Sequence, residues 1–326
     1  MTLPTVFITR PIPASLDALS AVATVEVWTE RQPPPVAVLR EKMAIADGLL
    51  CLLTDRIDRA LLQASPQLKV ISQMAVGYDN IDIAAATERG IPVGHTPGVL
   101  TNATADFTWA LLMAAARRVV EGDRFTRAGL WQTWEPDLLL GPEVSGATLG
   151  IVGFGRIGQA VARRAIGFDM RVLYCGQHPS AVAPAVNADF VSFETLLQTA
   201  DFVSLHVPLT PETYHLIDDR AFSQMKPSAI LVNTARGGVV DQAALFRALS
   251  QGQIAAAAID VTDPEPLPMD SPLLTLDNLI ITPHLGSASQ QTRTKMAQMA
   301  IANLIAGLQG NPLPHCVNPE VYHACP

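Results

Sequence analysis

Three polar residues follow apolar runs in an order that can serve acid–base chemistry on an acidic substrate. They are Arg236 in "LVNTARGG", Glu265 in "IDVTDPEPL" and His284 in "LIITPHLG". A guanidinium fork suits bidentate capture of a carboxylate, and a histidine titrates near physiological pH, so it can give or take a proton. A carboxylate beside that histidine holds its tautomer. Each residue alone is as easily a surface charge or a turn residue, but the three in order favour an active site.

A glycine-rich turn precedes these residues along the chain. Gly153, Gly155 and Gly158 form GxGxxG between the apolar run "TLGIV" and the amphipathic segment "RIGQAVARRA". In this context the first glycine makes a tight turn, the second admits a pyrophosphate, and the third lets the helix pack on its strand. The helix start then offers N–H groups to the phosphates. The residues expected against the cofactor here are Phe154, Gly155, Arg156 and Ile157.

The segment "RVLYCGQHP" (171–179) lacks an acidic residue that dinucleotide-binding sites usually carry. About 20 residues after the glycines, an Asp or Glu is expected on a ribose hydroxyl, but Cys175, Gly176 and Gln177 occupy that place. Without the acid, a ribose 2′-phosphate meets no repulsion, and Gln177 and His178 offer donors. We therefore expect NADP(H) to be preferred, with NAD(H) also possible because the loop has no Arg or Lys.

These residues need a frame of parallel strands to bring them together. Apolar runs alternate with helical patterns, which is typical of an α/β fold with parallel sheets covered by helices. One long helix is expected over 102–128. We predict two doubly wound domains: a substrate-binding domain over 1–101 and 285–326, and a dinucleotide-binding domain over 102–284. The tail from Asn311 is expected to be a loose extension. Strands are expected at 5–9, 48–53, 68–74, 91–95, 148–153, 171–175, 201–207, 229–233, 255–260 and 279–282.

Composition narrows the class of protein. Hydrophobic residues make up 49% of the 326 residues and charged residues 16%, so the chain can bury large cores. The formal net charge of −8 argues against a nucleic-acid surface. Apolar runs such as "ALLMAAA" are too short to span a bilayer. The four widely spaced cysteines predict reduced thiols in a cytoplasmic protein rather than disulfides or a metal site.

The chain resembles the D-isomer-specific 2-hydroxyacid dehydrogenases over essentially its whole length. The segments that carry the resemblance are "GFGRIG", "NTARGGVVD", "DVTDPEPL" and "TPHLGS". The segments "AVGYDNID", "TPGVLTNATAD" and "GLWQTWEPDLLLG" are most similar to glyoxylate/hydroxypyruvate reductases. The resemblance implies a flavodoxin-like substrate domain, a Rossmann cofactor domain and reduction of a small 2-oxo acid by NAD(P)H. Arg236, Glu265 and His284 would then bind the substrate and move the proton.

The same resemblance implies roles for further residues. Backbone N–H groups of Val76 and Gly77 would hold the substrate carboxylate, although an ordinary strand-end turn is an alternative. Trp134 would reach a neighbouring subunit's active site in a homodimer, or serve only dimer packing. Asp260 would bind the nicotinamide carboxamide or cap a turn. The remaining residues expected against the cofactor are Thr104, His206, Val207, Pro208, Thr234, Ala235 and Gly286.

Two alternative functions stay open. A phosphoglycerate dehydrogenase belongs to the same superfamily, and its shorter forms fit this length. The family also includes transcriptional corepressors that sense redox state by binding a dinucleotide, and they keep much of the same site. Turnover of a 2-oxo acid distinguishes an enzyme from such a sensor.

Overall fold

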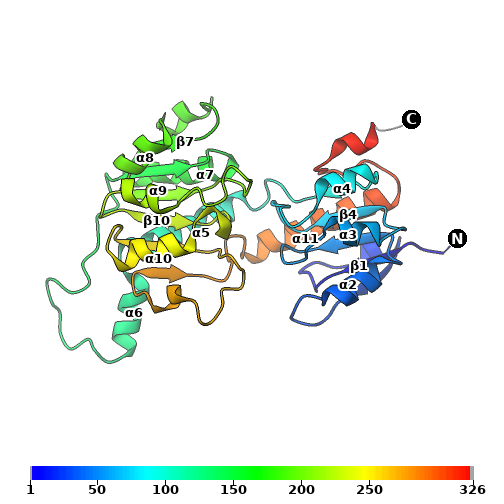
Figure 1. The fold of residues 1–326 in the computed structure, drawn as a ribbon, viewed down its shortest axis with the longest axis horizontal. Helices are drawn as coiled ribbons and strands as arrows, with labels where there is room; N and C mark the ends of the chain where they lie inside the picture. The colour runs from blue at the N-terminus through cyan, green and yellow to red at the C-terminus, as the bar shows by residue number, and fades with distance from the viewer. Residues whose placement is uncertain (1, 324–326) are drawn as a thin grey trace. The chain divides into compact units, whose positions relative to one another are not determined.

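The computed structural model describes residues 2–323, and the chain divides into two compact units (Figure 1). Unit 1 combines residues 1–100 with 288–326, and unit 2 is the continuous segment 101–287. Each unit is built on one parallel sheet, which confirms the predicted α/β fold of two doubly wound domains.

Unit 1 has five parallel strands in the order β2-β1-β3-β4-β5, which is the flavodoxin-like order. The strands are β1 (Thr5–Ile8), β2 (Thr24–Val27), β3 (Gly48–Cys51), β4 (Val70–Gln73) and β5 (Val93–Gly94). The helices are α1 (Asp17–Ser20), α2 (Val36–Met43), α3 (Arg59–Gln63), α4 (Ile83–Glu88) and α11 (Gln290–Leu308), with a 3-10 turn η5 (Pro319–Tyr322).

Unit 2 has seven parallel strands in the order β12-β11-β10-β9-β6-β7-β8. Counted within the unit this is 3-2-1-4-5-6 with a seventh strand added, so the sheet is of the Rossmann type. The strands are β6 (Thr148–Val152), β7 (Arg171–Cys175), β8 (Ala188–Phe190), β9 (Phe202–Leu205), β10 (Ile230–Asn233), β11 (Ala256–Ile259) and β12 (Leu279–Ile281). The helices are α5 (Thr101–Ala116), α6 (Val119–Arg127), α7 (Arg156–Ala165), α8 (Phe193–Thr199), α9 (Asp219–Gln224) and α10 (Gln242–Ser250), with 3-10 turns η1 (Ile166–Phe168), η2 (Ala183–Val186), η3 (Gly237–Val239) and η4 (Pro272–Thr275).

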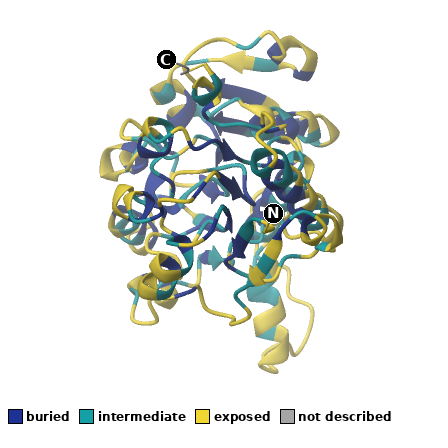
Figure 2. Cartoon of the chain, turned by 90° about the vertical axis from the view of Figure 1, so that its right-hand side faces the viewer, coloured by how far each residue is buried: buried dark blue, intermediate teal, exposed yellow. Residues whose placement is uncertain are grey.

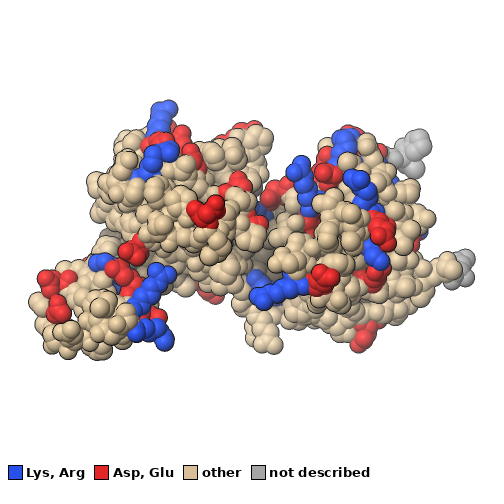
Figure 3. All heavy atoms as spheres, turned by 60° about the horizontal axis from the view of Figure 1, so that its bottom comes forward, with Lys and Arg blue, Asp and Glu red and all other residues tan. Residues whose placement is uncertain are grey.

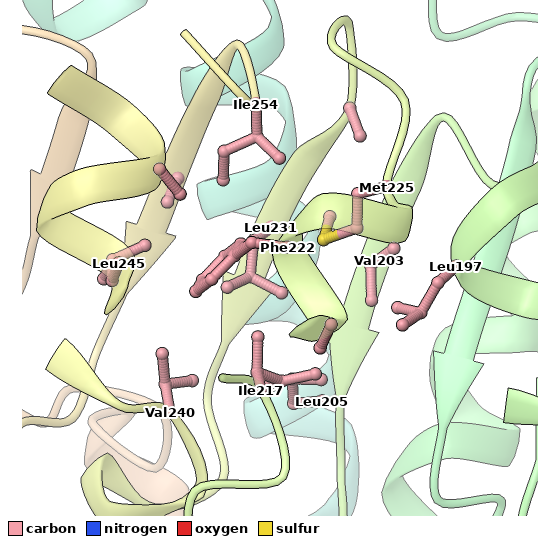
Figure 4. Packing of buried hydrophobic residues seen from close by; sticks show 14 of the residues in the cluster. Leu197, Val203, Leu205, Ile217, Phe222, Met225, Leu231, Val240, Leu245 and Ile254 are labelled. Carbon is pink, nitrogen blue, oxygen red and sulfur yellow. The ribbon is translucent and has the colours of Figure 1, made fainter. Parts of the chain in front are cut away.

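The central strands are apolar because both faces of each sheet are covered. In β10, Leu231 packs with α8, α9 and α10, while its neighbour Val232 joins α5 and α7 on the opposite face. Figure 4 shows the first of these clusters, in which Phe222 of α9 lies beside Leu231. Figure 2 shows the same layering, with buried strands inside and exposed residues on the outer helices and loops.

Two edge strands were not predicted, because neither has a continuous apolar run. The strand β2 alternates exposed and half-buried residues, and two of the three residues of β8 are exposed. Each lies at the end of its strand order, so only one neighbour shields it. Strand prediction from apolar runs therefore found the centre of each sheet and missed these edges.

The single helix predicted over 102–128 is wrong. The structure has α5 and α6, separated at Arg118, which takes a left-handed backbone conformation with φ of 50°. Its guanidinium pairs with Glu121, 2.7 Å away. Neither Gly nor Pro marks the break. Figure 1 shows α6 and the segment after it protruding from the rest of unit 2, which the uniform helical pattern did not indicate.

The described part of the tail, residues 311–323, is not a loose extension, and residues 324–326 lie outside the described residues. Cys316 bridges to Gly94, and Val317 N donates to Val93 O at 2.8 Å, so the tail pairs with β5. Asn318 is fully buried. Its side chain accepts from Val93 N (2.8 Å) and donates to Thr87 Oγ1 (2.9 Å) and Ile91 O (3.0 Å). The prolines and the absence of periodicity suggested a loose segment, but specific hydrogen bonds of Asn318 hold it against the rest of unit 1.

No helix among the described residues is long and apolar enough to cross a membrane. On the face drawn in Figure 3, Lys and Arg lie among Asp and Glu without a continuous basic area. Of the four cysteines, Cys51, Cys175 and Cys316 are free thiols, while Cys325 lies outside the described residues. The cytoplasmic location stays a prediction from the cysteine spacing.

Replacing Asn318 with alanine tests how firmly the tail is held. We expect Asn318→Ala to lower the free energy of unfolding by about 2 kcal/mol, because buried partners lose their hydrogen bonds. Asn311→Ala, an exposed change in the same tail, serves as the control. Urea unfolding of both variants measures the effect, and equal midpoints would show that the tail is not anchored by Asn318.

Candidate active site at the carboxyl edge of the unit 2 sheet

The residues predicted against the cofactor and at the reacting centre gather along one edge of the unit 2 sheet. All its strands are parallel, so the segments that follow them share the carboxyl edge. The glycine-rich turn follows β6 and His206–Pro208 follow β9, the adjacent strand. Between β6 and β9 the strand order reverses, and open α/β sheets bind ligands at such a point.

The glycine-rich turn has the geometry that a pyrophosphate requires. Gly153 has φ of +92°, and a Cβ there would lie 2.8 Å from His206 C and O, so only glycine fits. A Cβ on Gly155 would meet no atom within 4 Å, which leaves open space over the turn. The first bond of α7 runs from Gln159 N to Gly155 O, so the N–H groups of Arg156 and Ile157 have no acceptor within the helix. The turn therefore fits a dinucleotide.

The segment after β7 carries no acidic side chain at the strand end. Burial raises the pKa of Cys175 to about 11, so its thiol is uncharged at neutral pH. Gly176 is exposed and would admit a Cβ without contact. Tyr174 stacks on Phe154 with ring centroids 4.0 Å apart, and its hydroxyl accepts from Ser180 N at 2.8 Å. Phe154 is thus held as part of the wall beside the turn.

His206 is neutral at the centre of this edge. Its Nε2 lies 2.8 Å from Ser204 Oγ, and burial lowers its pKa to about 3. The imidazole therefore adds no positive charge to the phosphate site at physiological pH. Positive charge near the turn comes instead from Arg156, which is exposed at the start of α7.

His284 and Glu265 form a direct pair. His284 Nδ1 lies 2.6 Å from Glu265 Oε1, and the two side chains keep 26% and 36% of their surface exposed. A carboxylate accepts, so Nδ1 carries the proton of this bond and Nε2 is left as the reactive nitrogen. Both side chains are partly accessible to solvent, which a group that contacts a diffusing substrate requires.

Asp260 fixes the turn on which His284 sits. Its buried carboxylate accepts from Thr282 Oγ1 (2.6 Å), Leu285 N (2.7 Å) and Gly286 N (2.7 Å). Asp260 O also accepts from His284 N at 2.9 Å. His284 itself has φ of 54°, a left-handed conformation that is costly without such support. Both carboxylate oxygens thus hold the turn that carries His284, a role that differs from the predicted nicotinamide contact or local cap.

The loop that carries Arg236 is fixed by residues that sequence analysis missed. Asn233, buried at the end of β10, accepts from Ala235 N (3.0 Å) and donates to Arg236 O (2.9 Å). A Cβ on Gly237 would lie 2.1 Å from Thr262 C and O, so glycine lets the Arg236 loop pack on the segment that leads to Glu265. The signal was present in "NTARGG", where a strand-end Asn and adjacent glycines are typical of a shaped turn.

The remaining cofactor candidates of this unit lie beside these two loops. Thr234 Oγ1 is 2.8 Å from Thr108 Oγ1, which in turn donates to Thr104 O at 2.8 Å. A Cβ built on Gly286 would contact both Asp260 and Thr104. Thr104 is therefore brought to the Asp260 turn, although 156 positions separate it from Asp260 in the sequence (260 − 104).

Three predicted substrate residues lie elsewhere. Val76 and Gly77 belong to unit 1, in the loop after β4. Trp134 lies after α6 and is 78% exposed, and Trp131 is 59% exposed. Within the described part of the chain, no group of three or more His, Cys, Asp or Glu residues is arranged to hold a metal ion.

Comparison with known proteins identifies relatives of matching length. Residues 109–286 match the family described as "D-isomer specific 2-hydroxyacid dehydrogenase, NAD binding domain". A glyoxylate reductase of Korarchaeum cryptofilum is 51% identical, over 99% of this chain and 98% of its own.

Solved structures with a similar fold also cover almost the whole chain. The TT0316 protein of Thermus thermophilus superposes with a TM-score of 0.91 at 50% identity, over 96% of this chain and 99% of its own. An NADPH-dependent glyoxylate/hydroxypyruvate reductase of Sinorhizobium meliloti, in complex with NADP and malonate, gives a TM-score of 0.86 at 29% identity, with 98% of each chain covered.

Proposed function

The chain belongs to the D-isomer-specific 2-hydroxyacid dehydrogenase family, and we propose that it reduces glyoxylate or hydroxypyruvate to the corresponding 2-hydroxy acid with NAD(P)H. The 2.6 Å pair of His284 and Glu265 at the edge that carries the glycine-rich turn is the observation that carries this proposal. The pair would supply a proton-transfer group at the sheet edge proposed to bind the dinucleotide. Full-length likeness to glyoxylate reductases supports the choice of substrate.

The roles of the three residues follow from their chemistry. When bound, the nicotinamide cofactor supplies the hydride. Arg236 binds the substrate carboxylate and polarises the keto oxygen. His284 donates a proton from Nε2 to that oxygen as negative charge develops on it, while Glu265 holds Nδ1 and stabilises the imidazolium. In unit 1, the N–H groups of Val76 and Gly77 receive the carboxylate.

A substrate panel separates this proposal from its alternatives. Consumption of reduced cofactor with glyoxylate, hydroxypyruvate or pyruvate is expected, and the ratio of kcat/KM values identifies the preferred acid. A phosphoglycerate dehydrogenase would instead prefer the phosphorylated 2-oxo acid. Tight cofactor binding without turnover of any of these acids would contradict the proposal and favour the corepressor.

Removal of the histidine tests the proton-transfer assignment. His284→Ala should lower kcat by about 10²- to 10⁴-fold, because general acid catalysis is lost, while cofactor affinity is retained. Steady-state kinetics and a fluorescence titration with reduced cofactor measure the two quantities, and His323→Ala is an exposed control. Arg236→Ala should differ by raising KM for the 2-oxo acid about 10- to 100-fold. Near-normal kcat in His284→Ala would refute the assignment.

We propose that NADPH is preferred over NADH. Support comes from the end of β7, where Cys175 is uncharged and Gly176 has no side chain. A 2′-phosphate there meets no carboxylate, while Gln177 and His178 supply donors. Arg156 adds a nearby positive charge. Pro208 and Val207 then line the adenosine side.

Restoring the missing acid tests this preference. Gly176→Asp should lower the ratio of kcat/KM for NADPH to that for NADH by about tenfold or more, because the new carboxylate repels the 2′-phosphate and accepts from the ribose diol. A Cβ at Gly176 meets no atom within 4 Å, so the substitution is sterically tolerated. Gly167→Asp, at another open and exposed glycine, controls for added charge. A strong NADH preference in the unchanged protein would refute the proposal.

We propose a homodimer in which the segment after α6 contacts a second copy. Leu130, Trp131, Trp134 and Leu140 are all more than half exposed there, and large apolar side chains of this kind are typical of interfaces. Trp134 would then reach the partner's active site or pack in the interface alone.

Polar replacements test the interface. Trp131→Ser with Trp134→Ser should raise the dimer dissociation constant about tenfold or more, because aromatic anchors dominate such interfaces. Sedimentation equilibrium measures the constant, and Met269→Ser, 88% exposed and outside this segment, is the control. A wild-type chain that sediments as a monomer at micromolar concentration would contradict the dimer.

A further inference from the structure

We propose that His95 is a positioning residue that orients the loop Ala75–Tyr78 of unit 1 to receive the substrate carboxylate. The inference rests on the proposed 2-oxo acid reduction and deepens it. It names a side chain that acts through the backbone rather than by touching the substrate, and it was not among the residues that the sequence indicated.

The contact that carries the proposal lies between an imidazole and a peptide carbonyl. His95 Nδ1 is 3.0 Å from Val76 O. A carbonyl oxygen only accepts, so His95 must donate from Nδ1. The peptide between Val76 and Gly77 is planar and trans, so its N–H points opposite to its C=O. By holding Val76 O on one side, His95 turns the Gly77 N–H toward the other.

Gln73 orients the next peptide, between Gly77 and Tyr78, in a similar way. Gln73, fully buried at the end of β4, donates from Nε2 to Asn80 Oδ1 (2.7 Å) and, at longer range, to Gly77 O (3.4 Å). Cys51 Sγ donates to Gln73 Oε1 at 3.0 Å, which fixes the amide orientation. The Tyr78 N–H is thereby directed away from the core as well.

The aligned N–H groups are not used within the protein. Among the described residues, the backbone N–H groups of Val76, Gly77 and Tyr78 donate to no acceptor. Successive backbone N–H groups of this kind form a concave site for an anion. The orientation of the Gly77 and Tyr78 N–H groups depends on the two carbonyl contacts, and His95 makes the shorter one. The Val76 N–H is oriented by its own peptide, because Ala75 O accepts from Thr96 N at 2.8 Å.

His95 is itself held on both sides of its backbone. Its N donates to His315 O at 3.1 Å, and Asn303 Nδ2 donates to its carbonyl at 3.0 Å. Asn303 is fully buried in α11 and also accepts from His315 N (3.1 Å). The Tyr78 ring and the imidazole form a T-shaped pair with centroids 5.7 Å apart. The imidazole thus has a defined place from which to donate, supplied by α11 and the tail.

A matched pair of variants tests the role. His95→Asn keeps a donor near the position of Nδ1, whereas His95→Leu has a similar shape and no donor. We expect His95→Leu to raise KM for glyoxylate and the inhibition constant of oxamate together by about tenfold. Oxamate is an unreactive analogue of a 2-oxo acid, with an amide in place of the reducible carbonyl and a free carboxylate. We expect kcat to change less than about threefold, with cofactor affinity unchanged. His95→Asn should return both constants to near wild-type values.

The outcomes separate this inference from the proposed function. A wild-type chain that reduces none of the 2-oxo acids and binds no oxamate overturns the proposed function. A wild-type chain that turns over, with unchanged KM and oxamate inhibition in His95→Leu, overturns the inference alone. Equal losses in His95→Leu and His95→Asn also overturn it, because the donor would not be the relevant feature. If the leucine variant does not fold, His95→Gln replaces it, since its amide lies one methylene further from the backbone.

Discussion

The buried carboxylate of Asp260 is the constraint on which the proposed reacting centre depends. It stands at the end of β11, and it gathers a hydroxyl and two backbone N–H groups from the turn after β12. A buried carboxylate is tolerated only when its oxygens are satisfied, so the turn cannot relax without leaving a charge unpaired. That requirement keeps His284 in a left-handed conformation and within 2.6 Å of Glu265. The left-handed backbone of His284 and its hydrogen bond with Glu265 therefore both depend on the turn that Asp260 anchors.

Unit 1 solves a similar problem with neutral groups. Gln73 at the end of β4 and His95 just after β5 donate to carbonyls of the loop Ala75–Tyr78, and Asn303 of α11 donates to the His95 carbonyl. The anion binding proposed for this loop needs no formal positive charge, because peptide dipoles fixed in advance do not have to reorganise when the ligand arrives. Each unit thus fixes a few polar atoms at the carboxyl ends of its parallel strands. Unit 2 does so with a buried carboxylate, and unit 1 does so with neutral side chains.

The sequence predicted what depends on local pattern and left out what depends on contacts between distant segments. Apolar runs identified the central strands, and the glycine-rich turn was recognisable because its spacing is itself the geometric requirement. Asn233 was overlooked although its partner Arg236 O lies only three residues on, whereas the proposed role of His95 was not visible, since it depends on the carbonyl of Val76, 19 positions away. The break at Arg118 was missed because neither Gly nor Pro marks it. The tail was misjudged for a different reason, because Asn318 pairs with residues more than 220 positions away.

The split of unit 1 between the two ends of the chain has a consequence for biosynthesis. Unit 2 is one uninterrupted segment, so a ribosome delivers all of its seven strands before α11 emerges. The five strands of unit 1 come first, yet the helix that covers β3 and β4 and the tail that pairs with β5 come last. Of the two units, unit 1 thus begins synthesis before unit 2 but can finish folding only after unit 2 has been made. Until then its apolar sheet face stays uncovered, a state that favours chaperone binding in the interval.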